Sequence, residues 1–139
     1  MIDFQVVIDS NDPHRIARFW ANALGMEVED HHDQVVAMLE AGHATEKDTV
    51  TVDGRKAWKE GAALRDPHGH RPRILFQLVP EPKTVKNRVH LDLRVGEESR
   101  EATVEELIVA GARRLWEGAQ GPFTWVTLAD PEGNEFCVT

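Results

Sequence analysis

The sequence contains little cysteine, no tyrosine and no long hydrophobic run. Cys137 is the one thiol among 139 residues, which excludes an internal disulfide framework and a CxxC zinc or redox site. No stretch of about 18 apolar residues is present to span a bilayer. The N-terminus also lacks the basic and apolar regions of a secretion signal. We therefore expect a cytoplasmic protein that has no membrane partner.

Positive charge is also in short supply. The chain has 16 Lys and Arg residues against 24 Asp and Glu residues, for a formal net charge of −8 at pH 7. Binding to nucleic-acid phosphates needs a basic patch, and the basic residues here are scattered, so no nucleic-acid partner is expected. Gly-rich phosphate loops, HExxH helices and Ser-His-Asp arrangements are missing as well. The composition is instead typical of one globular domain, and a small molecule is the expected partner.

A turn motif that occurs twice indicates an internal repeat. The segment Asp66-Pro67-His68-Gly69 returns as Asp130-Pro131-Glu132-Gly133. Proline presets the backbone for a turn and glycine accepts a positive φ, so each copy is expected to join the last two strands of its half. A repeated unit that cannot bury its apolar face alone can bury it against its copy.

Each half of the sequence predicts one strand, one helix and then further strands. In the first half, Asp12 can cap a helix that ends at Gly25. In the second half, a helix with acidic residues in its first turn begins at Glu97 and ends at Gly111. The expected strands are 4–9, 35–39, 49–52 and 74–79 in the first half, and 88–95, 113–116, 123–128 and 136–139 in the second.

The pattern breaks between the halves at residues 80–86, where two prolines favour an extended connector. This connector is too short to link two independent domains. We therefore predict a single domain over 1–139, with module one at 1–79 and module two at 87–139.

The doubled βαβββ pattern, the two turn motifs, the segment 86–93 (KNRVHLDL) and the ending 130–138 (DPEGNEFCV) resemble the vicinal oxygen chelate superfamily. This group includes glyoxalase I, bleomycin-resistance proteins and extradiol dioxygenases. The chain is most similar to the bacterial glyoxalase-like domain proteins, over nearly its whole length. The resemblance implies an α+β fold of two tandem βαβββ modules, whose curved mixed sheets pair around a central cavity, and a homodimer.

The resemblance also implies metal ligands on the first and last strands of each module. It places the first-strand positions on Gln5 and His90 and a last-strand position on Gln77. In the second module the usual glutamate is replaced by Cys137. Glu135 projects from the same face of that strand, about 7 Å away, and is the alternative anionic ligand.

The predicted metal set is therefore Gln5, Gln77, His90 and Glu135, around one divalent metal such as Zn, Ni, Fe, Mn or Mg. Neutral amides compensate little of the charge of such an ion. The alternative is a polar cavity that holds no metal.

Two residues are the candidates for proton transfer. His90 can act as a ligand or as a general base, and its other interpretation is a strand histidine that is hydrogen-bonded to a neighbour. Glu135 in an apolar cavity should have a raised pKa, which suits proton abstraction. Its other interpretation is an ion pair with Arg88 or Arg94. For Cys137, an inert small hydrophobe is favoured over a reactive thiolate.

Because tyrosine is missing, the four tryptophans supply most of the large aromatic surface. Trp58 lies in a polar stretch where burial is not expected, so we predict that it covers a ligand or a subunit contact. The predicted substrate-binding residues are Trp58, Gln77 and Cys137.

These observations predict a glyoxalase-like protein that binds a small organic molecule in the cavity between its modules. If it is an enzyme, the resemblance implies a metal-dependent lyase or isomerase. One alternative is a metal-free protein of the bleomycin-resistance type that sequesters an antibiotic or toxic aromatic compound, and Cys137 in place of glutamate favours it. A structural or regulatory dimer is the other alternative.

Overall fold

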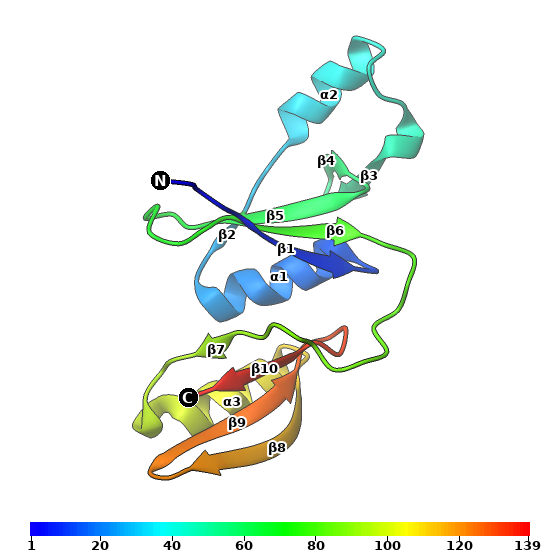
Figure 1. Ribbon diagram of the computed structural model, residues 1–139. Coiled ribbons are helices and arrows are strands. Elements are labelled where there is room, and N and C mark those ends of the chain that lie inside the picture. The colour runs from blue at the N-terminus through cyan, green and yellow to red at the C-terminus, as the bar shows by residue number, and fades with distance from the viewer. The chain divides into compact units, whose positions relative to one another are not determined.

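The computed structural model describes residues 1–139, and the chain divides into two compact units, Met1–Pro82 and Lys83–Thr139. The boundary between them falls inside the predicted connector 80–86. Each unit contains a curved mixed sheet of four strands and a helix that packs against it (Figure 1). None of the helices has both the length and the hydropathy that a membrane span requires.

The first unit has the strand order β1-β6-β5-β2. Its strands are β1 (Val6–Ser10), β2 (Glu27–Val28), β5 (Gly61–Arg65) and β6 (Ile74–Leu78). The pair β1 and β6 is parallel, whereas β6 with β5 and β5 with β2 are antiparallel. Helix α1 (Pro13–Leu24) packs against β5 and β6. The sheet therefore has the βαβββ connectivity that the repeat predicts.

Helix α1 begins and ends as its sequence predicts. The Asp12 side chain accepts a hydrogen bond from the Arg15 backbone N–H, at 3.3 Å. At the other end Gly25 adopts a left-handed conformation with φ of +62°. Ile16 and Trp20 lie on the buried stripe of the helix, with 1% and 3% of their surface exposed. This apolar stripe anchors the helix to the sheet.

An insertion that the sequence does not predict separates β2 from β5. It contains α2 (His32–Glu40), a short 3-10 helix (Glu46–Asp48) and the hairpin of β3 (Thr49–Val52) and β4 (Arg55–Trp58). The strand predicted at 35–39 is wrong, because this apolar run belongs to α2. Val35, Met38 and Leu39 follow the i, i+3, i+4 spacing of a helix, and Val35 is fully buried. The strand predicted at 49–52 exists as β3, but it lies in the hairpin and not in the main sheet.

The second unit repeats the topology without the insertion, in the order β7-β10-β9-β8. Its elements are β7 (Asp92–Leu93), α3 (Glu97–Val109), β8 (Arg113–Gln120), β9 (Phe123–Ala129) and β10 (Glu135–Val138). Val104 and Leu107 of α3 are buried against the sheet. The first strand is much shorter than the predicted 88–95, since only two residues pair regularly with β10.

Both repeated turns join the last two strands of their units, as predicted. The Asp66 carboxylate accepts hydrogen bonds from the backbone N–H groups of His70 and Arg71, at 2.8 and 3.0 Å. The Asp130 carboxylate does the same for Glu132 and Asn134, at 2.9 Å each. Each aspartate therefore organises its own loop by satisfying backbone donors.

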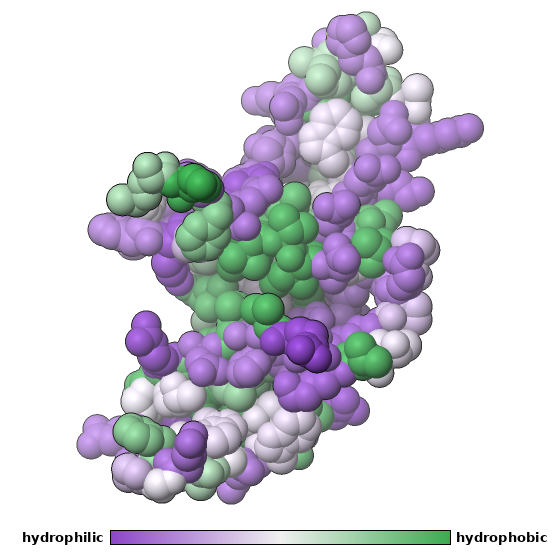
Figure 2. Space-filling model, viewed as in Figure 1, coloured by the Kyte–Doolittle hydropathy of each residue, from purple (hydrophilic) through white to green (hydrophobic).

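The two sheets expose different chemistry on the faces opposite their helices. In the first unit hydrophobic side chains cover β5 and β6 (Figure 2), and Val7 on β1 is 46% exposed. In the second unit the same view shows a paler and more polar surface over β8, β9 and β10 (Figure 2). The exposed face of the second sheet is thus the more polar of the two.

Candidate functional site

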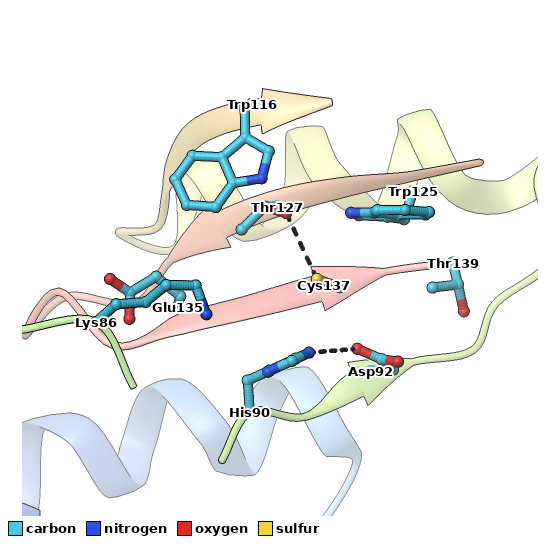
Figure 3. A pocket seen from close by; sticks show the side chains of 9 residues that line it. All are labelled: Lys86, His90, Asp92, Trp116, Trp125, Thr127, Glu135, Cys137 and Thr139. Carbon is cyan, nitrogen blue, oxygen red and sulfur yellow. Dashed lines mark hydrogen bonds and ion pairs between the residues drawn. The ribbon is translucent and has the colours of Figure 1, made fainter. Parts of the chain in front are cut away.

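A pocket of about 300 Å³ lies against the second sheet, on the face opposite α3 (Figure 3). All of its lining residues belong to the second unit. They are Lys86, His90, Asp92, Trp116, Trp125, Thr127, Glu135, Cys137 and Thr139. The pocket therefore combines two indole rings with cationic, anionic, imidazole, hydroxyl and thiol groups.

Strand register explains why four of these residues meet. Cys137 on β10 is paired with Asp92 on β7 and with Thr127 on β9, and Thr127 is paired with Trp116 on β8. Directly paired residues project from the same face of a sheet. The four side chains thus form one row across all four strands, with Cys137 and Thr127 at its centre.

Three groups of metal-ligand type converge on one side of the pocket. The ligand atoms of His90, Asp92 and Cys137 all lie within 4.8 Å of one another, and His90 Nε2 is 3.5 Å from Asp92 Oδ1. The His90 and Asp92 side chains are 41% and 54% exposed, whereas Cys137 is 9% exposed. These three residues, which we name the metal-ligand trio, hold one nitrogen, one oxygen and one sulfur donor at the pocket wall.

The thiol of Cys137 is neutral in this environment. Burial raises its pKa and the nearby Asp92 carboxylate adds to this effect, while Thr127 and Lys86 act in the opposite direction. Thr127 Oγ1 lies 3.5 Å from the sulfur. A bound cation would reverse this balance, since a coordinating thiol is deprotonated.

Two tryptophans provide the aromatic wall of the pocket. Trp125 on β9 is paired with Gly118 on β8, and a Cβ atom at Gly118 would overlap the Trp125 indole. Only glycine therefore allows this ring to lie against the neighbouring strand. Trp116 is 47% exposed and presents its ring to the pocket (Figure 3). A flat apolar group of a ligand would find indole surfaces here.

Glu135 does not have the environment that was predicted for it. Its carboxylate accepts hydrogen bonds from the Lys83 ammonium at 3.0 Å and from the Asn87 backbone N–H at 2.9 Å. Burial raises the pKa of Glu135, but Asn87 and Lys83 outweigh it, so the pKa lies below its ordinary value. The predicted rise is wrong, and the ion pair is with Lys83 instead of Arg88 or Arg94. Glu135 is a weak base that ties the start of the second unit to β10.

The sequence as a whole matches a family model described as glyoxalase-like domain, over residues 5–139. The chain belongs to the glyoxalase-like domain family. No protein with a curated function matches this glyoxalase-like chain significantly.

Solved structures share the fold of this glyoxalase-like protein at low sequence identity. A glyoxalase/bleomycin resistance protein/dioxygenase family enzyme from Burkholderia phytofirmans is 17% identical, with a TM-score of 0.63 over 96% of this chain and 94% of that one. The fosfomycin resistance protein FosX from Mesorhizobium loti is 10% identical, with a TM-score of 0.64 over 99% and 91%. A mutant of FosX from Listeria monocytogenes, complexed with Mn(II) and 1S,2S-dihydroxypropylphosphonic acid, is 13% identical, with a TM-score of 0.61 over 99% and 90%.

The donor chemistry of this glyoxalase-like protein fits a divalent metal. An imidazole, a carboxylate and a thiol are all ligands of borderline divalent ions, and three protein ligands leave a coordination position for water or substrate. The metal-ligand trio is therefore a candidate metal site. It contains two residues that the sequence singled out, His90 and Cys137, and one that it did not, Asp92.

The two glutamines predicted as ligands do not meet in the first unit. Gln5 accepts a hydrogen bond from Arg73 at 2.8 Å, whereas Gln77 is paired with Asp9. Val6 is paired with Ile74, so Gln5 and Gln77 lie four residues apart along the strands, about 13 Å. Their role as ligands stays a prediction, but they do not form one site with each other.

Trp58 lies at the end of β4 in the first unit and is half-buried. Its indole N–H donates to the Gln34 side chain at 3.4 Å, and its backbone oxygen accepts from His14 at 2.8 Å. These contacts fix Trp58 against α1 and α2. Its predicted part in covering a ligand stays a prediction.

Several pocket residues could have been found by strand alternation. Trp125 lies two residues before Thr127, so both face one side of β9. Asp92 follows His90 by the same two-residue step, although His90 precedes β7. Lys86 lies in the predicted connector, where strand alternation does not apply. Alternation identifies a face, but only the register between strands shows that Asp92 lies beside Cys137.

Proposed function

We propose that this glyoxalase-like protein binds a small organic molecule in the pocket of its second unit, beside a divalent metal held by His90, Asp92 and Cys137. One observation carries the proposal, namely that three ligand atoms converge within 4.8 Å at the wall of a pocket of about 300 Å³. Pockets of this volume suit small molecules. The FosX structure with Mn(II) and a phosphonic acid supports such a use of the fold.

The bound metal would act as a Lewis acid toward the oxygen atoms of the ligand. The chain's own residues bind and orient the rest of the molecule. The indoles of Trp116 and Trp125 accept its flat or apolar part, and the Lys86 ammonium at the pocket edge attracts an anionic group. Reaction as a lyase or isomerase is the finer form of this proposal.

Glu135 contributes to this function by holding a neighbouring segment in place. Its carboxylate is occupied by Lys83 and by the Asn87 backbone, and its lowered pKa makes proton abstraction unfavourable. It holds to β10 the segment that carries Lys86 and His90. We therefore assign Glu135 to positioning and His90 to holding the metal.

The test is the metal content of protein purified without chelator and without a nickel column, measured by elemental mass spectrometry. We expect a stoichiometric metal that is lost in His90→Ala and in Asp92→Asn. A matched control is His43→Ala, which removes an exposed histidine of the first unit and should leave the metal in place. Metal that persists in both site variants would remove the metal-ligand trio from the proposal.

Ligand binding is tested separately from the metal. A panel of α-ketoaldehydes, epoxides and catechols is titrated against wild type and against Gly118→Ala, which displaces the Trp125 ring without touching a ligand of the metal. We expect weaker binding in Gly118→Ala and unchanged binding in Ala119→Ser, at an exposed position on the other face of β8. Equal binding in both variants would place the ligand elsewhere.

A metal-free binding protein is the second candidate function. It is favoured by the aromatic wall and by the ion pair of Glu135 with Lys83, which leaves no free basic carboxylate at that side of the pocket. This candidate predicts that a panel compound binds equally well after treatment with chelator. The first proposal predicts that binding is lost with the metal and returns when the metal is added back.

A further inference from the structure

We infer that the metal site of the second unit is a thiolate site, which selects Zn²⁺ and similar thiophilic ions over Mn²⁺ and Mg²⁺ through Cys137. This inference rests on the proposed metal site and deepens it, because it names the class of ion. The observations that carry it are the placement of the sulfur, the composition of the donor set and the polar partner of the sulfur.

Cys137 occupies the central position of the trio. It is paired with Asp92 on the neighbouring strand, and its sulfur faces the same space as the His90 imidazole and the Asp92 carboxylate (Figure 3). Its 9% exposure means that the sulfur forms the base of the site, while the two exposed ligands form its rim. An ion that binds all three groups must therefore contact the sulfur.

The distances suit a small tetrahedral ion. Bond lengths of about 2.0–2.3 Å place the ligand atoms of tetrahedral zinc roughly 3.3–3.8 Å apart. His90 Nε2 and Asp92 Oδ1 already lie 3.5 Å apart, and no pair of ligand atoms in the trio exceeds 4.8 Å. Small side-chain rotations of the two exposed residues complete the geometry.

The donor set discriminates among divalent ions. Oxygen ligands suit Mg²⁺ and Mn²⁺, while thiolate and imidazole favour zinc and other softer ions. One sulfur, one nitrogen and one oxygen leave a hard ion with a single carboxylate. A glutamate at position 137 would supply a second carboxylate and move the preference toward hard ions.

Thr127 supplies a polar partner for the sulfur. Its hydroxyl lies 3.5 Å from Cys137 Sγ, and the residue is 3% exposed. A hydroxyl in this position can donate a hydrogen bond to a thiolate and orient it toward the ion, as the outer partners of metal ligands do. The site thus contains both a soft ligand and a group that stabilises its charged form.

The experiment uses the full chain after removal of metal by chelator, titrated with Co²⁺ and then with Zn²⁺ and Mn²⁺ in competition. Because Cys137 is the one cysteine, a sulfur-to-cobalt charge-transfer band in the near ultraviolet can arise from this residue alone. We expect the band in wild type, its displacement by Zn²⁺, and no displacement by equimolar Mn²⁺. Cys137→Ser should lose the band and bind Zn²⁺ about 100-fold more weakly. Loss of a residue that only hydrogen-bonds to a metal ligand already lowers metal affinity by about 10- to 100-fold.

Two further variants keep the test decisive if Cys137→Ser folds poorly. Thr127→Val should retain the band but weaken Zn²⁺ binding about tenfold, whereas the isosteric Thr51→Val, at an exposed position of β3, should change nothing. Cys137→Glu should lose the band and gain affinity for Mn²⁺ relative to Zn²⁺.

Each failure has a distinct meaning. Zn²⁺ binding without a charge-transfer band, or equal affinity for Zn²⁺ and Mn²⁺, would overturn the thiolate inference and leave the proposed metal site standing. If no divalent ion binds, both the inference and the proposed metal-dependent function are overturned.

Discussion

The carboxylate of Glu135 shows at the scale of one residue how neighbours decide chemistry. It is 13% exposed and accepts hydrogen bonds from Lys83 and from the Asn87 backbone. Glu135→Ala leaves both donors without their acceptor, which should lower the free energy of unfolding by about 1–2 kcal/mol. Urea denaturation of the full chain measures this loss.

The control for this substitution is Glu105→Ala, at an exposed position of α3, where alanine is a good helix former. We expect its unfolding midpoint to stay at or above that of wild type. Equal midpoints for Glu135→Ala and wild type would mean that the segment 83–87 is not held to β10 by this carboxylate.

The same residue marks a limit of sequence reasoning. The family resemblance drew attention to His90 and Cys137, because it rests on short motifs of residues close in sequence. The partner of Glu135 could not be found in this way, since Lys83 lies 52 residues away. The predicted pKa had the wrong direction because burial was considered without these two donors.

At the scale of secondary structure elements, Arg73 links the two edge strands of the first sheet. Its guanidinium donates to Gln5 next to β1 and to both oxygens of Glu29 next to β2, at 2.7–2.8 Å. The hydrogen bond from Arg73 is the main reason that the pKa of Glu29 lies below its ordinary value, and burial opposes it only in part. The charged form of Glu29 therefore favours the folded state.

This linkage predicts a loss of stability in acid. A carboxyl with a lowered folded pKa contributes its full stability above the unfolded pKa of about 4.3, and loses it as the pH falls through the folded value. Thermal unfolding midpoints between pH 7 and 3 should therefore fall less steeply for Glu29→Gln than for wild type. Glu27→Gln is the control, because its ion pair with Arg65 on the neighbouring strand β5 is exposed and should change the slope little. Parallel slopes for wild type and Glu29→Gln would contradict the prediction.

The sequence predicts a helix or strand correctly where its start, its buried face and its end all have recognisable residues. Helix α1 has a capping aspartate, an apolar stripe and a terminal glycine, all of which the structure confirms. Helix α2 has no side-chain cap and one buried residue, so its run of apolar residues alone favours a strand. Strand β2 has only two paired residues, and such an element depends on tertiary pairing with β5 that no local pattern reveals.

At the scale of the whole molecule, the repeated turn predicted two units of one topology, and the structure contains them. The units differ in what they add to that topology. The first carries the insertion of α2, β3 and β4, while the second carries every residue of the pocket and of the metal-ligand trio. The two units thus share a scaffold and differ in the chemistry that it carries.

This division predicts where a bound metal stabilises the chain. A ligand that binds only the folded state at 100 times its dissociation constant stabilises that state by about 2.7 kcal/mol. Because all three ligands lie in the second unit, Zn²⁺ should slow hydrogen exchange in β9 and β10 by up to about 100-fold, with little change in α1. Mass spectrometry of the exchanged peptides measures both regions in one sample. Cys137→Ser is the control, and at the same Zn²⁺ concentration its protection should fall to about twofold. Equal protection of α1 and β9 would instead show that the two units open together, so that the free energy of metal binding is shared by the whole chain.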